Sequence, residues 1–363
     1  MSDIDKAYSV EVDHLTKNSW YDILRGFRDA NIYQTWAYDA VRYGEKSVSH
    51  LILKRDKNIV AATQVRVMKI PFINAGVAYV RWGPLWKRYD TNNQLEDFHQ
   101  IIKAMRKEYV ERRGLLLWII PNEKEQCSEI RSTIESAGFK WTGKDYRTLY
   151  LDIAQPLEAI RNNMSKSWRK HLNKAENREL TVIEGSGMDL FDIVDQLFRE
   201  TVLRKGFEPG INIDEYRALQ ENLPENAKMR IMVCKSEGQP IAGLIGSAIG
   251  DIGIELVAAT GNDGMELGGS YLLRWKMLEY LRGCGCHFYN LNGISPERNP
   301  GGYQFKTGFS GNNCQDVYFI GNFEACENQV SALSVKYGNT LFSNYRKGKV
   351  VVNSLLTKYK RVK

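Results

Sequence analysis

The stretch IVAATQVRVMKI, which begins at Ile59, and the stretch IAGLIGSAIG, which begins at Ile241, open the same succession of elements in the two halves of the chain. Each follows a short strand pattern and a polar turn, RDKN at 55–58 and SEGQP at 236–240. Each precedes further strand and helix patterns. A succession of elements that recurs at so long a period predicts two structural copies in one chain.

Outward from these stretches, strand patterns at 49–54, 59–70, 75–84 and 115–121 and a helix pattern at 94–113 make up the first copy. The second copy has strand patterns at 228–235, from 241, from 252 and at 287–292, with a helix at 271–282. This order predicts an α/β fold with a mixed sheet and covering helices in each copy. We expect one domain at 1–153, closed by the strand TLYLDI at 148–153. The second domain is expected at 154–325, with a tail at 326–363.

Composition narrows the class of protein. The 363 residues, 43% hydrophobic and 26% charged, suffice for two globular domains. The six cysteines form no CxxC pair and the five histidines form no HxxxH pair, so we expect no metal site. No signal peptide is visible, and no apolar run reaches the ~18 residues of a membrane span. These features predict a cytoplasmic protein.

The formal net charge of +7 is concentrated in the tail. No acidic residue follows Glu327, whereas eight basic residues do: Lys336, Arg346, Lys347, Lys349, Lys358, Lys360, Arg361 and Lys363. Such a segment suits a polyanion, either RNA or the anionic face of a membrane. A solvated terminus, or a tail that packs back on the first domain, is the alternative.

Three stretches are candidates for binding anions or activated groups. The first is GNDGMELGGS at 261–270, a glycine-rich loop before a helix, where backbone N–H groups near Gly264, Gly268 and Gly269 could cradle an anion. It resembles the phosphate loop of the acetyl-CoA-dependent N-acetyltransferase (GNAT) superfamily. The usual Gln or Arg is missing, and Glu266 would repel a pyrophosphate. The pattern therefore indicates a GNAT-like shape with weak or no CoA binding, or a plain strand-to-helix connection.

The second candidate is YNLNGI at 289–294 followed by GGYQFKTGFSG at 301–311. Lys306 lies between Phe305 and Phe309 in this run, so a water-poor pocket around its ammonium would stabilise an oxyanion or a phosphate. The third is SKSWRKHLNKAENR at 165–178, a helix pattern with an apolar stripe of Trp168, Leu172 and Ala175. Its cations Lys166, Arg169, Lys170 and Lys174 would hold an anion or simply form a solvated face.

These stretches together resemble the FemABX family of non-ribosomal peptidyltransferases, which share a tandem GNAT-like fold. Further matches are YQTWAY at 33–38 and AYVRWGP at 78–84, so the resemblance covers about residues 30 to 325. The strongest match is YNLNGI followed by the Lys306 stretch. Trp82 stands where many members carry arginine, which widens the expected acceptors to precursors of other envelope polysaccharides.

The resemblance implies transfer of an amino acid from aminoacyl-tRNA to an amine on a nucleotide- or lipid-linked cell-envelope precursor. It implies no cofactor beyond the co-substrate. The catalytic residues would be Lys306 and Tyr289, and Asp90 and Asp251 are further candidates for a general base. The donor would be bound by Gly302, Tyr303, Phe305, Phe309, Gly268 and Gly269. The acceptor would be bound by Trp36, Tyr79, Arg81 and Arg169.

Two other functions stay open at this point. An acyl-CoA-dependent N-acyltransferase acting on an amino sugar would bind acetyl-CoA despite the altered loop. A non-enzymatic scaffold at the membrane would bind lipid through the basic tail and would not depend on Lys306.

Overall fold

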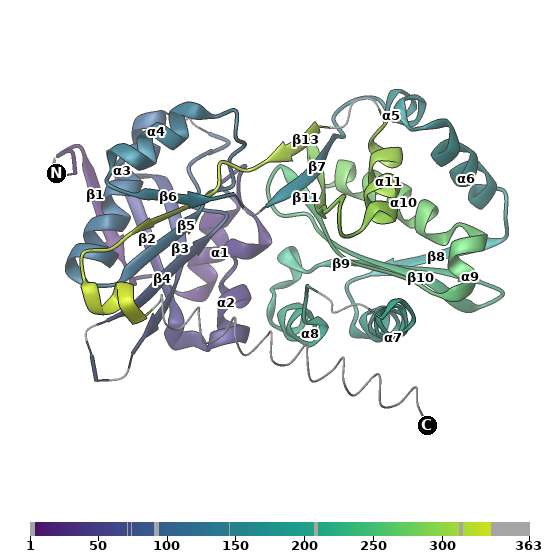
Figure 1. Cartoon of the computed structure of the whole chain (residues 1–363), viewed down its shortest axis with the longest axis horizontal. Helices are drawn as coiled ribbons and strands as arrows, with labels where there is room; N and C mark the ends of the chain where they lie inside the picture. The colour runs from purple at the N-terminus through teal and green to yellow at the C-terminus, as the bar shows by residue number, and fades with distance from the viewer. Residues whose placement is uncertain are drawn as a thin grey trace.

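The computed structural model describes residues 4–70, 72–73, 75–90, 94–144, 146–206, 210–311 and 315–334. Over these residues the chain forms two lobes side by side, each built on a 7-stranded mixed sheet with helices packed against it (Figure 1). The α/β fold with two GNAT-like domains is thereby confirmed. The tail from residue 335 onward lies outside the described residues.

The first half of the chain supplies most of the first sheet. Its strands are β1 (Tyr8–Val12), β2 (Val48–Arg55), β3 (Asn58–Lys69), β4 (Gly76–Arg81), β5 (Leu116–Ile120) and β6 (Lys140–Gly143). Its α-helices are α1 (Lys17–Leu24), α2 (Trp36–Tyr43), α3 (Leu95–Met105) and α4 (Ser128–Ser136). Short 3₁₀ turns η1 (Ile32–Gln34) and η2 (Glu45–Ser47) flank α2, and the π-helical η3 (Arg106–Arg112) continues α3.

The second half supplies most of the second sheet. Its strands are β8 (Leu180–Gly185), β9 (Arg230–Ser236), β10 (Gln239–Ser247), β11 (Ile252–Thr260), β12 (Phe288–Gly293) and β13 (Gln315–Tyr318). The helices α5 (Leu157–Asn163), α6 (Lys166–Glu176), α10 (Gly269–Gly283) and α11 (Pro300–Ser310) cover one face (Figure 1). The other face carries α7 (Met188–Lys205) and α8 (Ile213–Asn222); η4 (Glu225–Ala227) and α9 (Asn262–Leu267) are short connections.

The two sheets have the same strand order, and each borrows one strand from the other half of the chain. The first runs β1-β2-β3-β4-β5-β14-β6, and the second, read from its far edge, runs β8-β9-β10-β11-β12-β7-β13. β7 (Arg147–Asp152) pairs with β12 and β13, whereas β14 (Asn322–Ala325) pairs with β5 and β6. The prediction that TLYLDI closes the first sheet is therefore wrong. The apolar pattern of that stretch predicts a buried strand but does not determine which strands it pairs with.

The two connections that carry the exchanged strands meet at an aromatic cluster. Tyr146 precedes β7 and Phe319 follows β13, and their ring centroids lie 5.1 Å apart. Both rings contact Trp82, at 5.3 and 5.4 Å, and the Phe319 N–H donates to the Tyr146 carbonyl at 3.3 Å. Trp82, the residue at which the sequence departs from the family pattern, therefore holds together the two connections that carry β7 and β14.

Three apolar cores support this arrangement. One lies between the first sheet and α3, η3 and α4, and one lies between the second sheet and α6, α10 and α11. The third joins the lobes, because α1 and α2 of the first pack against α7, α8 and the second sheet. The interface between the lobes is thus a continuous core, which the lobes share.

Candidate active site

The second sheet opens where its two parallel strands part. β11 and β12 pair only over three positions, Ile252 with Phe288 to Ile254 with Asn290. Beyond that point β11 continues to Thr260 and, among the described strands, pairs with β10 alone. The equivalent parallel strands of the first sheet, β4 and β5, stay paired along all of Val77–Arg81. Among the described residues, the two parallel strands therefore part in the second sheet but stay together in the first.

Lys306 lies beside this opening on α11. Most of the GGYQFKTGFSG stretch forms this helix, Pro300–Ser310. Pro300 occupies its first turn, and the Asn299 side chain accepts from the Gly302 N–H at 3.0 Å. Lys306 is half-buried, and its Nζ donates to the Gly293 carbonyl at 3.1 Å. The side chain thus points back towards the end of β12.

A buried ionic cluster forms the floor of the site. Glu255 on β11 accepts from Arg274 Nη2 at 2.8 Å and from the Tyr289 hydroxyl at 3.3 Å. Burial lowers the pKa of the Lys306 ammonium; the charge of Glu255 opposes this effect and that of Arg274 adds to it. Burial also raises the pKa of Tyr289 well above its ordinary value, with Glu255 adding to the effect. Tyr289 therefore stays protonated and positions Glu255, which excludes it as a general base near neutral pH.

Aromatic rings wall the lysine. The Phe305 ring lies 4.9 Å from Tyr271 and 5.7 Å from Trp168, and the Arg274 guanidinium lies 4.7 Å from its centroid. Phe309 is buried at 4.6 Å from Trp168. The structure brings Lys306, Phe305, Phe309 and Tyr289 together, as the sequence predicts. Tyr303 lies one turn earlier on α11, and its hydroxyl reaches Asp316 at 3.4 Å.

The YNLNGI stretch builds the turn that Lys306 contacts. Asn290 is fully buried; its Oδ1 accepts from the Asn292 N–H at 2.8 Å and from the Thr148 hydroxyl at 2.6 Å. This bracing holds Asn292 in a left-handed conformation, with φ at 64°. The Gly293 carbonyl is thereby turned towards Lys306. The two asparagines of the motif thus have a backbone-shaping role.

The glycine-rich stretch 261–270 connects β11 to α10, as its sequence allowed. Residues 262–267 form α9, and only Gly268 separates it from α10. A Cβ added at Gly264 would lie 2.0 Å from the Ile241 carbonyl, and one at Gly269 would lie 3.1 Å from the Ile241 side chain. A Cβ at Gly268 would lie 3.1 Å from Ala175 of α6. These glycines therefore allow close packing on β10 and α6.

A second group of residues gathers cations and tyrosines in the first domain. Arg66 on β3 lies between Tyr43 and Tyr79, at 4.2 and 4.3 Å from the ring centroids. Arg81 on β4 lies 4.1 Å from the Tyr33 ring and donates to the Tyr38 hydroxyl at 3.0 Å. We call Arg66, Tyr79, Arg81, Tyr33 and Tyr38 the basic-aromatic cluster. Its anchor Arg66 was missed from the sequence, because only the pairing of β3 with β4 places it opposite Tyr79.

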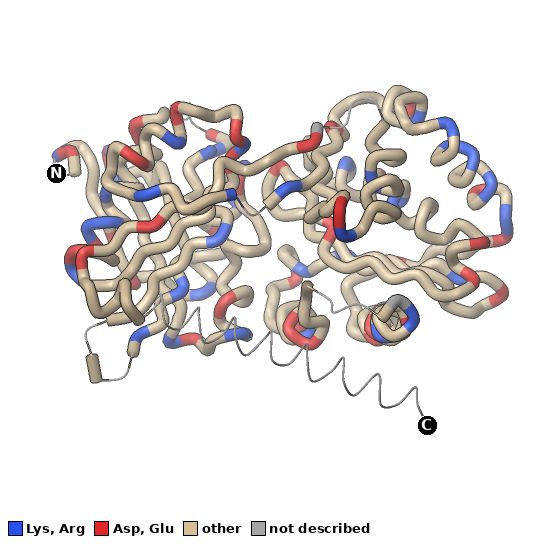
Figure 2. Tube along the Cα trace, in the orientation of Figure 1, with Lys and Arg blue, Asp and Glu red and all other residues tan. Residues whose placement is uncertain are grey.

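The other predicted acceptor residues lie outside this cluster. Trp36 begins α2 and stacks on the buried His50 at 4.4 Å, a packing contact in the first domain's core. Arg169 lies on α6 at the far end of the second domain, where it donates to the Asn162 carbonyl at 2.7 Å. α6 follows the N-cap residue Ser165 and carries a row of Lys and Arg residues (Figure 2). Because α6 packs against α11, this row lies on a helix that contacts the helix of Lys306.

A series of contacts joins the basic-aromatic cluster to Lys306. Tyr33 of the cluster packs on Trp82 at 4.7 Å, and Trp82 packs on Tyr146. The Tyr146 hydroxyl donates to Asn292 Oδ1 at 3.1 Å, and the next residue, Gly293, accepts from Lys306. The predicted donor and acceptor sides therefore lie on one packed structure. Asp90 and Asp251 lie elsewhere, paired with Arg88 and Tyr89.

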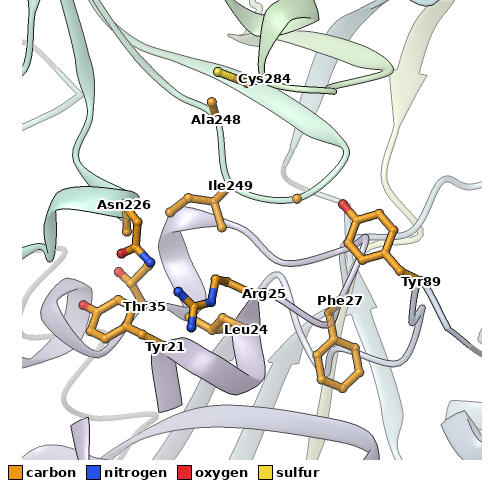
Figure 3. Close-up of a pocket in the computed structure, with 12 residues that line it drawn as sticks. Tyr21, Leu24, Arg25, Phe27, Thr35, Tyr89, Asn226, Ala248, Ile249 and Cys284 are labelled. Atoms are coloured by element: carbon orange, nitrogen blue, oxygen red, sulfur yellow. The ribbon is translucent and has the colours of Figure 1, made fainter. Parts of the chain in front are cut away.

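Two cavities border the domain junction and the end of β11. The larger, about 320 Å³, lies between α1 and the β10–β11 turn, and its lining includes Arg25, Tyr89, Asn226 and Cys284 (Figure 3). The other, about 280 Å³, lies between α7 and the end of β11. There Arg204 donates to Asn262 Oδ1 and to the Thr260 carbonyl, both at 2.7 Å. The second cavity borders Thr260, the last residue of the stretch of β11 that does not pair with β12.

Metal and membrane features were also sought in the described part of the chain. No group of three or more His, Cys, Asp and Glu side chains there could hold a metal ion. None of the helices in the described ranges is long and apolar enough to cross a membrane.

The two mixed sheets have the same strand order, and in the second sheet the parallel strands part beside the half-buried Lys306. These features define a two-domain acyltransferase of the GNAT-like class. The FemAB family model matches residues 27–235 and 214–341, and the chain belongs to this family. Family membership supports an acyltransferase or aminoacyltransferase. No curated protein matches the chain.

Solved structures share the fold at low sequence identity. The crystal structure of FemX is 15% identical, with a TM-score of 0.75 over 88% of this chain and 98% of that one. The C-terminal domain of a putative lysylphosphatidylglycerol synthetase from Agrobacterium fabrum is 14% identical, with a TM-score of 0.52 over 90% and 95%. A conserved protein of unknown function from Bacteroides thetaiotaomicron is 11% identical, with a TM-score of 0.54 over 88% and 99%. At these identities the likeness concerns the fold alone.

Proposed function

We propose that this protein transfers an aminoacyl group from aminoacyl-tRNA to an amine on a cell-envelope precursor, with Lys306 as the catalytic residue. The observation that carries the proposal is the position of Lys306 beside the opening between β11 and β12, above the buried Glu255–Arg274 pair. A desolvated cation at such a place stabilises negative charge far better than one in water.

The surroundings favour tRNA over CoA as the carrier of the donor group. α6 covers the start of α10, since the His171 and Tyr271 rings stack at 4.9 Å and Ala175 packs on Gly268. A pyrophosphate bound at that helix N-terminus would collide with α6. The exposed Lys166, Lys170 and Lys174 on the outer face of α6 instead suit a longer polyanion.

The acceptor is proposed to bind in the first domain. The guanidinium groups of Arg66 and Arg81 lie on tyrosine rings, which hold them in place and keep them partly desolvated. Arginine in that setting suits the phosphate or carboxylate groups of an envelope precursor. The contacts through Trp82 and Tyr146 then set the distance from this anchor to Lys306.

The chemistry is aminolysis of an ester. The acceptor nitrogen forms a bond to the carbonyl carbon, the bond from that carbon to the ribose oxygen breaks, and one proton passes from the amine to the released hydroxyl. The Lys306 ammonium stabilises the oxyanion and, with its lowered pKa, is a stronger proton donor to the leaving oxygen. The amine then returns a proton to Lys306. Positioning of donor and acceptor contributes the rest of the rate.

Transfer assays with purified protein test this proposal. Charged tRNA and acetyl-CoA would each be offered with nucleotide-linked and lipid-linked peptidoglycan precursors, and products read by mass spectrometry. We expect transfer from tRNA, and a loss of about 10²–10⁴-fold in kcat for Lys306→Ala, the range typical of a general acid–base group. Lys276→Ala, at an exposed lysine on α10, is the matched control and should keep the wild-type rate. Full activity of Lys306→Ala, or transfer from acetyl-CoA alone, would refute the assignment.

A further inference from the structure

Helix α6 carries a row of exposed lysines (Figure 2). Lys166, Lys170 and Lys174 recur every fourth residue, so they follow one side of the helix at intervals of ~6 Å. We call these three residues the lysine row. None of them is ion-paired among the described residues, and the acid of α6, Glu176, bridges to Arg161 instead. The charge of the lysine row is therefore available to a polyanion.

An exposed aromatic ring lies between the lysine row and α10. His171 stacks on Tyr271 of α10, with the ring centroids 4.9 Å apart and the planes at 12°. The Nδ1 of His171 lies 2.8 Å from the Ser167 carbonyl oxygen, which can only accept, so this nitrogen donates and holds the ring in place. One face of the ring meets Tyr271, while the residue as a whole stays exposed. A fixed ring beside cations is the combination on which proteins stack nucleic-acid bases.

A series of ring contacts leads from His171 to the proposed catalytic lysine. Tyr271 lies 4.9 Å from Phe305, centroid to centroid, and Phe305 directly precedes Lys306 on α11. Two ring-to-ring steps therefore separate His171 from the neighbour of Lys306. At that short distance, a base stacked on His171 belongs to a nucleotide close to the acylated 3′ end of the donor, where tRNA is unpaired.

We propose that His171 stacks on a base of the unpaired 3′ end of an RNA donor, and that the lysine row binds the phosphates that lead to it. The identity of this RNA as the aminoacyl donor rests on the proposed function, whereas the binding surface itself does not.

Other roles explain this surface less well. A bilayer would use the cations, but in the described chain no exposed large hydrophobic side chain lies on α6 to enter the acyl region. A bilayer would also leave the stack of His171 on Tyr271 without a role. A purely structural role for His171, in the packing of α6 on α10, predicts a loss of stability when the ring is removed and no change in RNA affinity.

Binding of two matched RNAs by the full chain tests the stack. A 5′-labelled hairpin that copies the tRNA acceptor stem would be titrated with and without its unpaired 3′ nucleotides, and fluorescence anisotropy would report binding. The wild type should bind the tailed hairpin more tightly than the blunt one. His171→Ala should weaken binding of the tailed hairpin about tenfold or more, as expected for the loss of one base–aromatic stack, and leave the blunt hairpin unchanged.

Two further variants complete the comparison. His171→Phe keeps an aromatic ring at the position and should restore binding of the tailed hairpin. His14→Ala, at an exposed histidine of the first domain, is the matched control and should bind as wild type. Thermal melts of all variants check that each is folded.

Salt dependence tests the lysine row separately. Replacing all three lysines by alanine should weaken binding of both hairpins and should reduce the slope of log K against log salt by about two to three. His171→Ala should leave this slope unchanged, because stacking releases no counterions.

Three outcomes overturn the inference. The first is a tailed hairpin that binds no better than the blunt one. The second is a lowered melting temperature of His171→Ala with unchanged affinity for the tailed hairpin. The third is flotation of the wild type, but not of the triple lysine variant, with phosphatidylglycerol vesicles, combined with no binding of either hairpin. That result would make a bilayer the partner of the lysine row.

Transfer assays separate this inference from the proposed function. With charged tRNA as donor, His171→Ala should raise KM about tenfold and leave kcat within about twofold, because the stack binds donor and transition state alike. An unchanged KM for charged tRNA overturns the inference alone. Absence of transfer from charged tRNA by the wild type overturns the proposed function, while the hairpin titrations still decide whether His171 binds RNA.

Discussion

Replacing Glu255 by Gln tests whether the floor of the site is a true buried ion pair. Glu255 Oε1 lies 2.8 Å from Arg274 Nη2, and the side chains of the two residues are 5% and 9% exposed. Glu255 Oε2 also accepts from the Tyr289 hydroxyl at 3.3 Å. Glutamine keeps the size and a carbonyl acceptor but leaves the Arg274 guanidinium buried without a counter-charge. The variant therefore removes one charge and little else.

The expected cost follows from that burial. Removing one member of a buried pair costs about 3–5 kcal/mol, and the retained amide hydrogen bond points to the lower end. For domains of this size, 1 kcal/mol corresponds to roughly 2–4 °C in melting temperature. We therefore expect a loss of about 3 kcal/mol and a fall of roughly 6–12 °C. Fluorescence-monitored denaturation in urea, with thermal melts alongside, measures both quantities.

A double-mutant cycle with Arg274→Met completes the test. Replacing both charges removes the pair without leaving either ion buried, so Glu255→Gln/Arg274→Met should be less destabilised than the sum of the single variants. A cost below about 1 kcal/mol for Glu255→Gln, or strictly additive costs, would refute the argument that the pair is ionised and desolvated.

The same variants should shift the pH dependence of transfer in opposite directions. The charge of Glu255 raises the pKa of Lys306 and that of Arg274 lowers it. Because the protonated lysine is the proposed active form, activity is lost as pH rises through its pKa. The alkaline limb of the kcat profile should therefore move to lower pH in Glu255→Gln and to higher pH in Arg274→Met.

Two further predictions concern stability. Burial between Trp20 and Trp36 lowers the pKa of His50 from 6.5 to about 4. The folded state therefore loses stability as pH falls from 6.5 to about 4. The urea midpoint of His50→Gln should depend less on pH over that range than the midpoint of the wild type. Gly250 has φ at 74°, and a Cβ added there would lie 2.3 Å from the Ala30 carbonyl oxygen across the domain junction. Gly44 has a similar φ of 83°, but a Cβ added there would have nothing within 4 Å. Gly250→Ala should therefore cost about 1–3 kcal/mol more in free energy of unfolding than Gly44→Ala. Equal urea midpoints for the two alanine variants would show that the junction at Gly250 can yield.

Local sequence patterns predicted the elements and the duplication. The strand IVAATQVRVMKI and the stripe of Trp168, Leu172 and Ala175 both appear in the structure as expected. Each depends on a pattern within a few residues, which a sequence records directly. Lys306 was singled out for the same reason, because its phenylalanine neighbours lie one and three residues away.

The features that were missed depend on contacts between distant segments. Glu255 is one acid in the strand IGIELVAAT, and only the fold places it against Arg274 and Tyr289. The stretch GNDGMELGGS contains the glycines of an anion loop, yet these glycines allow helices to approach β10 and α6. A glycine pattern indicates that a side chain would not fit at those positions. It does not indicate whether a ligand or the protein's own backbone lies next to the glycines.

The exchange of β7 and β14 has a consequence for the reaction itself. For the lobes to swing apart, β7 would have to leave β12 and β13, or the cluster of Trp82, Tyr146 and Phe319 would have to come apart. Either step exposes a shared core, so opening by a hinge between the lobes is costly. Arg81, the proposed acceptor anchor, and the amine of Lys306 therefore stay at a fixed separation. Under the proposed function, this separation selects acceptors by the distance between their anionic group and their amine, so that the domain junction determines specificity as well as stability.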